Sequence, residues 1–142
     1  MRGQSWHLDD IPTGYVHVFG AAPILPEDIA LFEQRFGPAL PMRLDEDTQG
    51  AAPQALVYAI WTRLVWEETR DWPVTARIGQ DALRWIGWAR AGDVLHVRLT
   101  IKAKHMLTDQ RGMLFAQHEI LNQDGALVLS LMTRTELARR AG

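Results

Sequence analysis

The chain has 142 residues, which is a typical length for one domain. Hydrophobic residues make up 47% of it and charged residues 23%, as in ordinary globular proteins, and the formal net charge is −2. This charge, without a basic cluster, argues against a nucleic-acid-binding protein. The chain has no cysteine, which excludes disulfides, thiolate catalysis and cysteine-ligated zinc. The five histidines show no metal-ligand spacing, so no metal site is predicted.

The first residues contain no apolar stretch of signal-peptide length, and we expect a cytoplasmic protein with no membrane contact. Residues 1–14 are predicted to form a surface lead-in that closes in a turn. Alternating side chains over Tyr15–Phe19 predict a short strand. A helix is predicted to begin at Leu25–Asp28, where proline and acidic residues suit a first turn, and to end at Gly37.

The segment from Ala51 to Glu68 is the most hydrophobic part of the chain. Between Ala55 and Trp66 only Thr62 and Arg63 are polar, so apolar side chains cover nearly the whole circumference of a helix. Such a helix is normally buried, and this one is shorter than the roughly 20 residues that span a membrane. We therefore predict that residues 51–68 form a central helix wrapped by a sheet.

After residue 73 the hydrophobic period changes from that of a helix to that of strands. A turn is indicated at Ala91–Asp93 and a hairpin at Asn122–Gly125. The order of elements predicts one α+β domain over residues 1–142, in which a curved antiparallel sheet surrounds the central helix. The strands predicted are 82–89, 95–103, 113–121 and 126–137.

Three parts of the sequence resemble the MaoC-like dehydratases and (R)-specific enoyl-CoA hydratases of the hot-dog superfamily. They are Ile24–Ile29 with Phe32, then Leu83–Trp85 followed by Ala91–Leu95, and Ile120–Gly125. The resemblance implies a single hot-dog fold. It also implies a role in fatty acid metabolism as a lyase that adds or removes water across the 2,3 bond of an acyl thioester. Coenzyme A or phosphopantetheine would then be part of the substrate, and no separate cofactor is expected.

The resemblance is weakest where the family's chemistry lies. In the family, an aspartate and a histidine hold the reacting water as general base and acid. Aligned on Pro38, Pro41 and Asp45, those two positions fall on Gly37 and Arg43. Glycine has no group to titrate and arginine stays protonated, so the usual dyad is missing and hydro-lyase activity stays an open question.

Candidate site residues surround the start of the central helix. Backbone N–H groups there would polarise a thioester carbonyl, with Gln54 as a donor. Arg43 would grip a carboxylate or phosphate of the ligand, and Tyr58 would line the acyl channel. Asp45 and Asp47 are candidates for a replacement catalytic base; alternatively, they only favour the helix dipole and solubility.

Outside this region, His17 and His118 are interpreted as core histidines with satisfied hydrogen bonds.

Three functions stay open. The first is an acyl-thioester hydratase or dehydratase with an atypical acid or base. The second is a non-catalytic acyl-binding module or a partner subunit, which would form a heterodimer with a dyad-bearing hot-dog chain. The third is an acyl-CoA thioesterase, for which Asp47 is the nearest carboxylate because Glu67 and Glu68 lie at the other end of the helix. The resemblance implies a homodimer joined at its sheet edges, and six tryptophans suit a large apolar contact.

Overall fold

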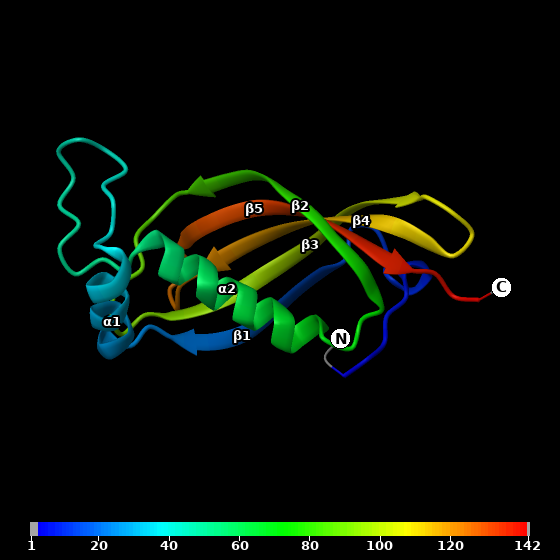
Figure 1. The fold of residues 1–142 in the computed structure, drawn as a ribbon, viewed down its shortest axis with the longest axis horizontal. Helices are drawn as coiled ribbons and strands as arrows, with labels where there is room; N and C mark the ends of the chain where they lie inside the picture. The colour runs from blue at the N-terminus through cyan, green and yellow to red at the C-terminus, as the bar shows by residue number, and fades with distance from the viewer. Residues whose placement is uncertain (1–2, 142) are drawn as a thin grey trace.

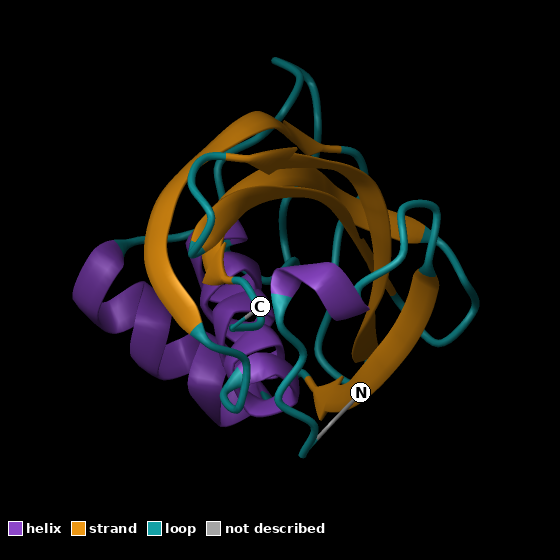
Figure 2. Ribbon diagram, turned by 90° about the vertical axis from the view of Figure 1, so that its right-hand side faces the viewer, coloured by secondary structure: helices purple, strands orange, loops and turns teal. Residues whose placement is uncertain are grey.

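The computed structural model describes residues 3–141 and has a hot-dog fold, as predicted. Five strands form one antiparallel sheet in the order β1-β3-β4-β5-β2 (Figure 1). The sheet curves around the long helix α2, as Figure 2 shows, and the short helix α1 lies near the start of α2. The elements are η1 (Leu8–Asp10), β1 (Val16–Pro23), α1 (Pro26–Phe36), α2 (Gln54–Thr69), β2 (Val74–Trp85), β3 (Val94–Met106), β4 (Arg111–Leu121) and β5 (Leu127–Ala138).

The core lies between α2 and the concave face of the sheet. Strand β3 shows how the sequence builds it: every second side chain points inward and is buried, while the side chains between them are more exposed. The helix contributes Val57, Trp61, Leu64 and Val65, which recur at helical spacing on one face. The inward side chains of β3 are Leu95, Val97, Leu99 and Ile101.

The sheet covers only one side of α2. Ala55, Ala59 and Thr62 are exposed on the opposite side, and Trp66 keeps 50% of its surface accessible. The apolar residues around the circumference of α2 predicted that the helix is buried on all sides. In a single chain the sheet buries only one of these sides. The apolar outer face of α2 is therefore available for contact with another molecule.

Strand β2 differs most from its prediction, because it begins at Val74 and ends at Trp85 instead of spanning 82–89. It is an edge strand, and its pairing with β5 shifts register at three places. Ala82 at one of these shifts has φ of 51°. An exposed strand with bulges does not need strict alternation, so its sequence lacks the period that marks the other strands.

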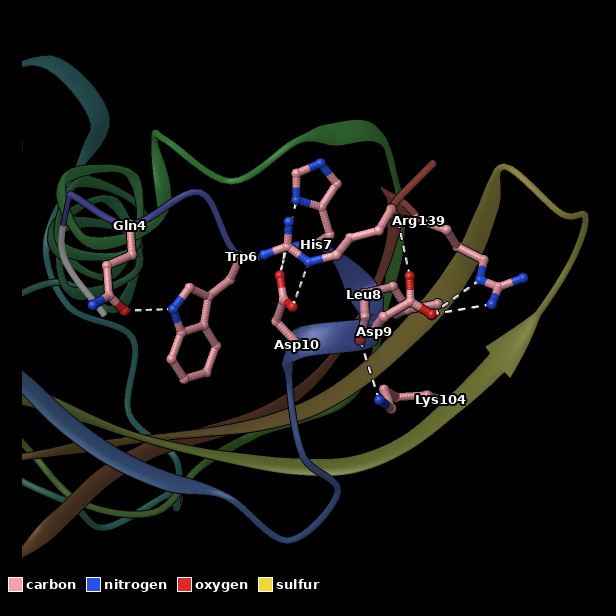
Figure 3. A network of polar contacts seen from close by, with 9 residues as sticks. Gln4, Trp6, His7, Leu8, Asp9, Asp10, Lys104 and Arg139 are labelled. Atoms are coloured by element: carbon pink, nitrogen blue, oxygen red, sulfur yellow. Dashed lines mark hydrogen bonds and ion pairs between the residues drawn. The ribbon is translucent and has the colours of Figure 1, made fainter. Parts of the chain in front are cut away.

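Residues 3–14, the described part of the predicted surface lead-in, are anchored by contacts with the core and with the end of β5. Leu8 and Ile11 are buried in the core. Figure 3 shows Asp9 accepting hydrogen bonds from Arg139, whose Nη2 lies 3.1 Å from Oδ1. The backbone N–H of Arg140 also donates to Asp9, and these bonds, the Arg140 one first, hold the pKa of Asp9 below its usual value. These bonds join the segment around Asp9 to the residues that follow β5, beside the β3–β4 hairpin.

A glycine in β1 allows α2 to approach this strand closely. Gly20 has φ of 84°, and a Cβ at this position would lie 2.8 Å from Cδ2 of the buried Leu64. We expect Gly20→Ala to lower the free energy of unfolding by about 2–4 kcal/mol, through backbone strain and overpacking together. Urea denaturation measures this loss. Gly14→Ala is the matched control, because Gly14 has φ of 87° with no neighbour within 4 Å. Equal losses in the two variants would show that Leu64 does not limit the space at Gly20.

Candidate functional site

The start of α2 is held in place by the segment that follows β2. The N–H of Ala52 donates to the carbonyl of Ala89 over 2.7 Å, and Ala51 forms a β-bridge with Arg90. The Arg90 side chain donates to the carbonyl of Gln49 over 2.9 Å. The helix therefore begins at Gln54 and not at the predicted Ala51, because residues 51 and 52 are paired with this neighbouring segment.

Two backbone N–H groups are free at this helix start. The amides of Leu56 and Val57 both donate to the carbonyl of Pro53, at 3.0 and 3.2 Å. The amides of Gln54 and Ala55 have no hydrogen-bond partner among residues 3–141. They lie at the positive end of the helix dipole and next to a rigid backbone. Such a pair of N–H groups can donate hydrogen bonds to a carbonyl oxygen or to an anion.

The side chain of Gln54 is hydrogen-bonded to the loop that precedes α2. Its Oε1 accepts a hydrogen bond from the N–H of Leu40 over 3.1 Å, and its Nε2 donates to the carbonyl of Leu40 over 2.6 Å. These two bonds fasten the loop of residues 37–53 to the first turn of α2. One N–H of the Gln54 side-chain amide is therefore used within the protein, while the backbone N–H of Gln54 has no partner among residues 3–141.

Gly37, at the position that the alignment gives to the family aspartate, adopts a glycine conformation. It follows the last residue of α1 with φ of 99°, and its N–H donates to the carbonyl of Glu33 over 2.9 Å. A side chain at this φ would be strained. This backbone conformation therefore favours glycine, and a titratable side chain here would carry a cost in strain.

Arg43 and Asp45 lie together in a hollow of about 470 Å³ between the loop and the end of β2. Arg43 is exposed, and no carboxylate among the described residues is within salt-bridge distance of it. The indole Nε1 of Trp88 is buried and has no hydrogen-bond partner within residues 3–141. The hollow is lined by Met42, Arg43, Asp45, Glu46, Trp85, Ile86, Gly87 and Trp88.

The other predicted site residues have local contacts. Oδ1 of Asp47 accepts from the N–H of Gln49 over 2.9 Å, so this carboxylate stabilises a turn of the loop. The hydroxyl of Tyr58 donates to Oε1 of Gln80 over 2.8 Å, and its ring packs on Trp61. In the part of the chain that the structure describes, neither Asp45 nor Asp47 is hydrogen-bonded to a histidine.

The structure brings a histidine and a carboxylate together at the opposite end of α2. Nε2 of His17, on β1, lies 2.8 Å from Oε1 of Glu68, which is buried in the last turn of the helix. The ring of His17 also stacks on Phe19. His17 and Glu68 are 51 positions apart in the sequence, and no local sequence pattern predicts that they meet. The pair ties the end of α2 to β1, in agreement with a structural role for His17.

His118 is a fully bonded core histidine, as the sequence suggested. Its Nδ1 accepts from the indole N–H of Trp61 over 3.1 Å, which places the proton on Nε2, 3.0 Å from Oγ1 of Thr133. Burial, and secondarily the charge of Arg77, lower the pKa of His118 from 6.5 to about 3. The imidazole is therefore neutral at physiological pH and does not act as an acid there.

Within residues 3–141, no cluster of three His, Asp or Glu side chains suits a metal ion. The same residues contain no helix that is both long and apolar enough to cross a membrane.

Solved structures with the same fold include proteins named as dehydratases and hydratases. A MaoC-like dehydratase from Rhodospirillum rubrum is 25% identical, with a TM-score of 0.80, and the match covers 97% of this chain and 100% of that one. The (R)-hydratase PhaJ1 from Pseudomonas aeruginosa is 21% identical, with a TM-score of 0.65 over 96% of this chain and 91% of the hydratase. The structural neighbours thus include MaoC-like dehydratases and (R)-hydratases, as the sequence motifs indicated.

A third neighbour contains two units of this size. This protein, from Mycobacterium tuberculosis, is described as a double hot-dog fold, and 96% of the present chain covers 45% of it at 18% identity and a TM-score of 0.74. No family model matches the sequence, and no curated protein matches it.

The environment of His118 predicts how stability depends on pH. In the unfolded chain the imidazole takes up a proton near pH 6.5, whereas in the folded chain it does so only near pH 3. Its contribution to the free energy of unfolding is therefore complete above pH 6.5 and falls as the pH drops towards 3, by at most about 1.4 kcal/mol per unit. NMR of the imidazole nitrogens should show a neutral Nε2–H form throughout pH 5–8. A titration centred near 6.5 would contradict this environment.

Proposed function

We propose that this chain is a MaoC-like hot-dog protein that binds an acyl thioester at the start of α2 without the usual Asp/His dyad. The observation that carries the proposal is the pair of unpartnered N–H groups at Gln54 and Ala55. They would donate to the thioester carbonyl, which accumulates negative charge when a nucleophile adds to the conjugated double bond. The named activities of the structural neighbours support this class of ligand.

The surrounding groups favour binding over hydration. Water addition needs a general base beside the substrate, and the two dyad positions hold Gly37, in its left-handed conformation, and the cationic Arg43. Asp45 lines the hollow together with Arg43 and Glu46, and it is the residue we would assign as base if turnover occurs. Asp47 is held by the turn it caps, which counts against a thioesterase that uses it.

Arg43 and Tyr58 complete the proposed site. Arg43 is exposed and belongs to the same loop as Leu40, which is hydrogen-bonded to Gln54. From this loop, Arg43 would contact a phosphate of coenzyme A or of a carrier's phosphopantetheine. Tyr58, one turn beyond Gln54, would contact the acyl chain. A ligand of this type would suit a role in fatty acid metabolism in the cytoplasm.

The test is to measure binding and turnover of the same ligands. We expect crotonyl-CoA and longer enoyl-CoAs to bind, as measured by calorimetry, with no hydration detectable as loss of the enoyl absorbance. Gln54→Pro removes an N–H donor at a helix position that tolerates proline, and should weaken binding about five- to tenfold. Gln54→Ala also loses the bonds to Leu40 but keeps the N–H, so it isolates the effect of the donor.

Two results would overturn parts of this proposal. Equal affinities for the Gln54→Pro and Gln54→Ala variants would show that the helix start does not hold the carbonyl. Turnover that disappears in Asp45→Asn would establish hydratase activity with an atypical base, in place of a binding function.

We also propose that the chain forms a homodimer through β2 and the outer face of α2. Strand β2 is an edge strand with unpaired backbone groups on one side, and it exposes 53% of Ile78 and 40% of Leu83. The exposed Trp66 of α2 lies near the same edge. These apolar groups suit a contact between two copies. The alternative is a heterodimer with a dyad-bearing hot-dog chain, which the double fold of one neighbour favours.

Sedimentation equilibrium of the purified chain tests the dimer. We expect a mass twice the 16.1 kDa of the chain, and Ile78→Glu should shift the equilibrium to the monomer because it buries a charge in the contact. Val18→Glu is the control, since Val18 is equally exposed on the opposite edge strand β1. A wild-type chain that stays monomeric at high concentration would favour the heterodimer.

A further inference from the structure

Residues 3–14, which we call the strap, have few backbone bonds to the rest of the chain. Apart from the three-residue helix η1, the strap contains no helix or strand. Within residues 3–141, one bond joins the backbone of the strap to the sheet: the N–H of Gly14 donates to the carbonyl of Ile101 over 2.8 Å. A segment attached in this way opens at a lower free energy than the strands of a sheet do.

Apolar side chains anchor the strap to the body of the protein. Leu8 and Ile11 are buried in the core. Leu8 packs on β4 at a glycine, because a Cβ on Gly112 would overlap Cδ2 of Leu8. The indole of Trp6 stacks on that of Trp72, with ring centroids 6.4 Å apart and planes 9° from parallel. The strap therefore fits a surface that has room for it, and it covers Trp72.

Ion pairs fasten the strap to the residues that follow β5, as Figure 3 shows for Asp9 and Arg139. Beside this pair, Nε of Arg140 lies 2.7 Å from Oδ1 of Asp10. The four side chains keep between 22% and 59% of their surface accessible to solvent. Single ion pairs in such positions are weak, and salt weakens them further.

Closing the strap leaves two buried nitrogen atoms without hydrogen bonds. Nδ1 of His7 and Nε1 of Trp72 have no partner within residues 3–141. Oδ2 of Asp10 is 3.9 Å from Nδ1 of His7, which is too far for a hydrogen bond. Water satisfies such groups when they are exposed, so their burial costs free energy in the closed form. The ion pairs and apolar contacts of the strap offset this cost, and the loss of either favours the open form.

We propose that the strap opens as a unit and that the ion pairs of Arg139 and Arg140 control how often it opens. Opening removes Trp6 from the ring of Trp72. Because Trp72 also lines the cavity between α2 and the sheet, it then becomes the remaining barrier between solvent and that end of the cavity. This device goes beyond the proposed thioester function and does not depend on it, since the strap and its partners lie outside the loop before α2 and the first turn of α2.

Hydrogen exchange of the purified chain, followed by NMR, measures opening of the strap separately from unfolding of the core. The amides of Asp10 and Ile11 are bonded to carbonyls within the strap. We expect them to exchange, relative to their intrinsic rates, about a hundredfold or more faster than the amides of β4, and with little dependence on low denaturant concentrations. The indole N–H of Trp72 should exchange through the same opening.

Removing the ion pairs should open the strap more often. In the double variant Arg139→Gln/Arg140→Gln, exchange at Asp10, Ile11 and the Trp72 indole should be about tenfold faster than in the wild type. Raising the salt concentration from about 20 to about 500 mM should accelerate this exchange in the wild type but not in the double variant. Arg139→Lys/Arg140→Lys keeps both charges and should stay close to the wild type.

Arg98→Gln is the matched control. It removes a pair with Glu119 between β3 and β4, at 2.9 Å, which stays formed whether the strap is open or closed. It should therefore leave exchange in the strap unchanged. The proposal is overturned if the strap amides exchange no faster than those of β4, if the glutamine double variant or salt does not affect them, if Arg98→Gln accelerates them equally, or if the Trp72 indole does not follow them.

Discussion

The packing of one face of α2 against the concave side of the sheet determines the rest of the structure. Buried side chains at helical spacing meet the inward side chains of β3, β4 and β5, and this contact excludes water from most of the core. Gly20 lets the helix approach β1, and the His17–Glu68 pair fastens its far end. Because the helix is fixed at both ends, its first turn can present free N–H groups in a constant geometry.

The start of α2 is held in place by hydrogen bonds from two neighbouring segments. The bond from Ala52 to Ala89 and the Gln54–Leu40 clamp hold the first turn and its loop together. These interactions serve to position backbone donors, as a site for a carbonyl oxygen requires. The loop beside them carries Gly37, which has no titratable group, and Arg43, which stays protonated.

The two ends of α2 offer different environments to a ligand. At the N-terminal end, two backbone N–H groups have no partner among residues 3–141, and the preceding loop lines an open, polar hollow with Arg43. At the C-terminal end, tryptophans enclose an apolar cavity whose opening lies beside Arg77. The open outer face of the helix runs between them along the edge strand β2. The two ends of α2 thus differ in polarity and in the groups that they expose.

Much of the fold could be predicted from the sequence, because periodicity reports which face of an element is buried. Alternation in β3 and the apolar run of α2 predicted a sheet around a helix, whereas the assignment of Gly37 and Arg43 to the positions of a missing dyad stays a prediction. Tertiary structure alone decided the extent of β2, the use of the Gln54 side chain, and the meeting of His17 with Glu68. Pairs such as His17 and Glu68 depend on how distant segments pack, and no local pattern in a sequence records that distance.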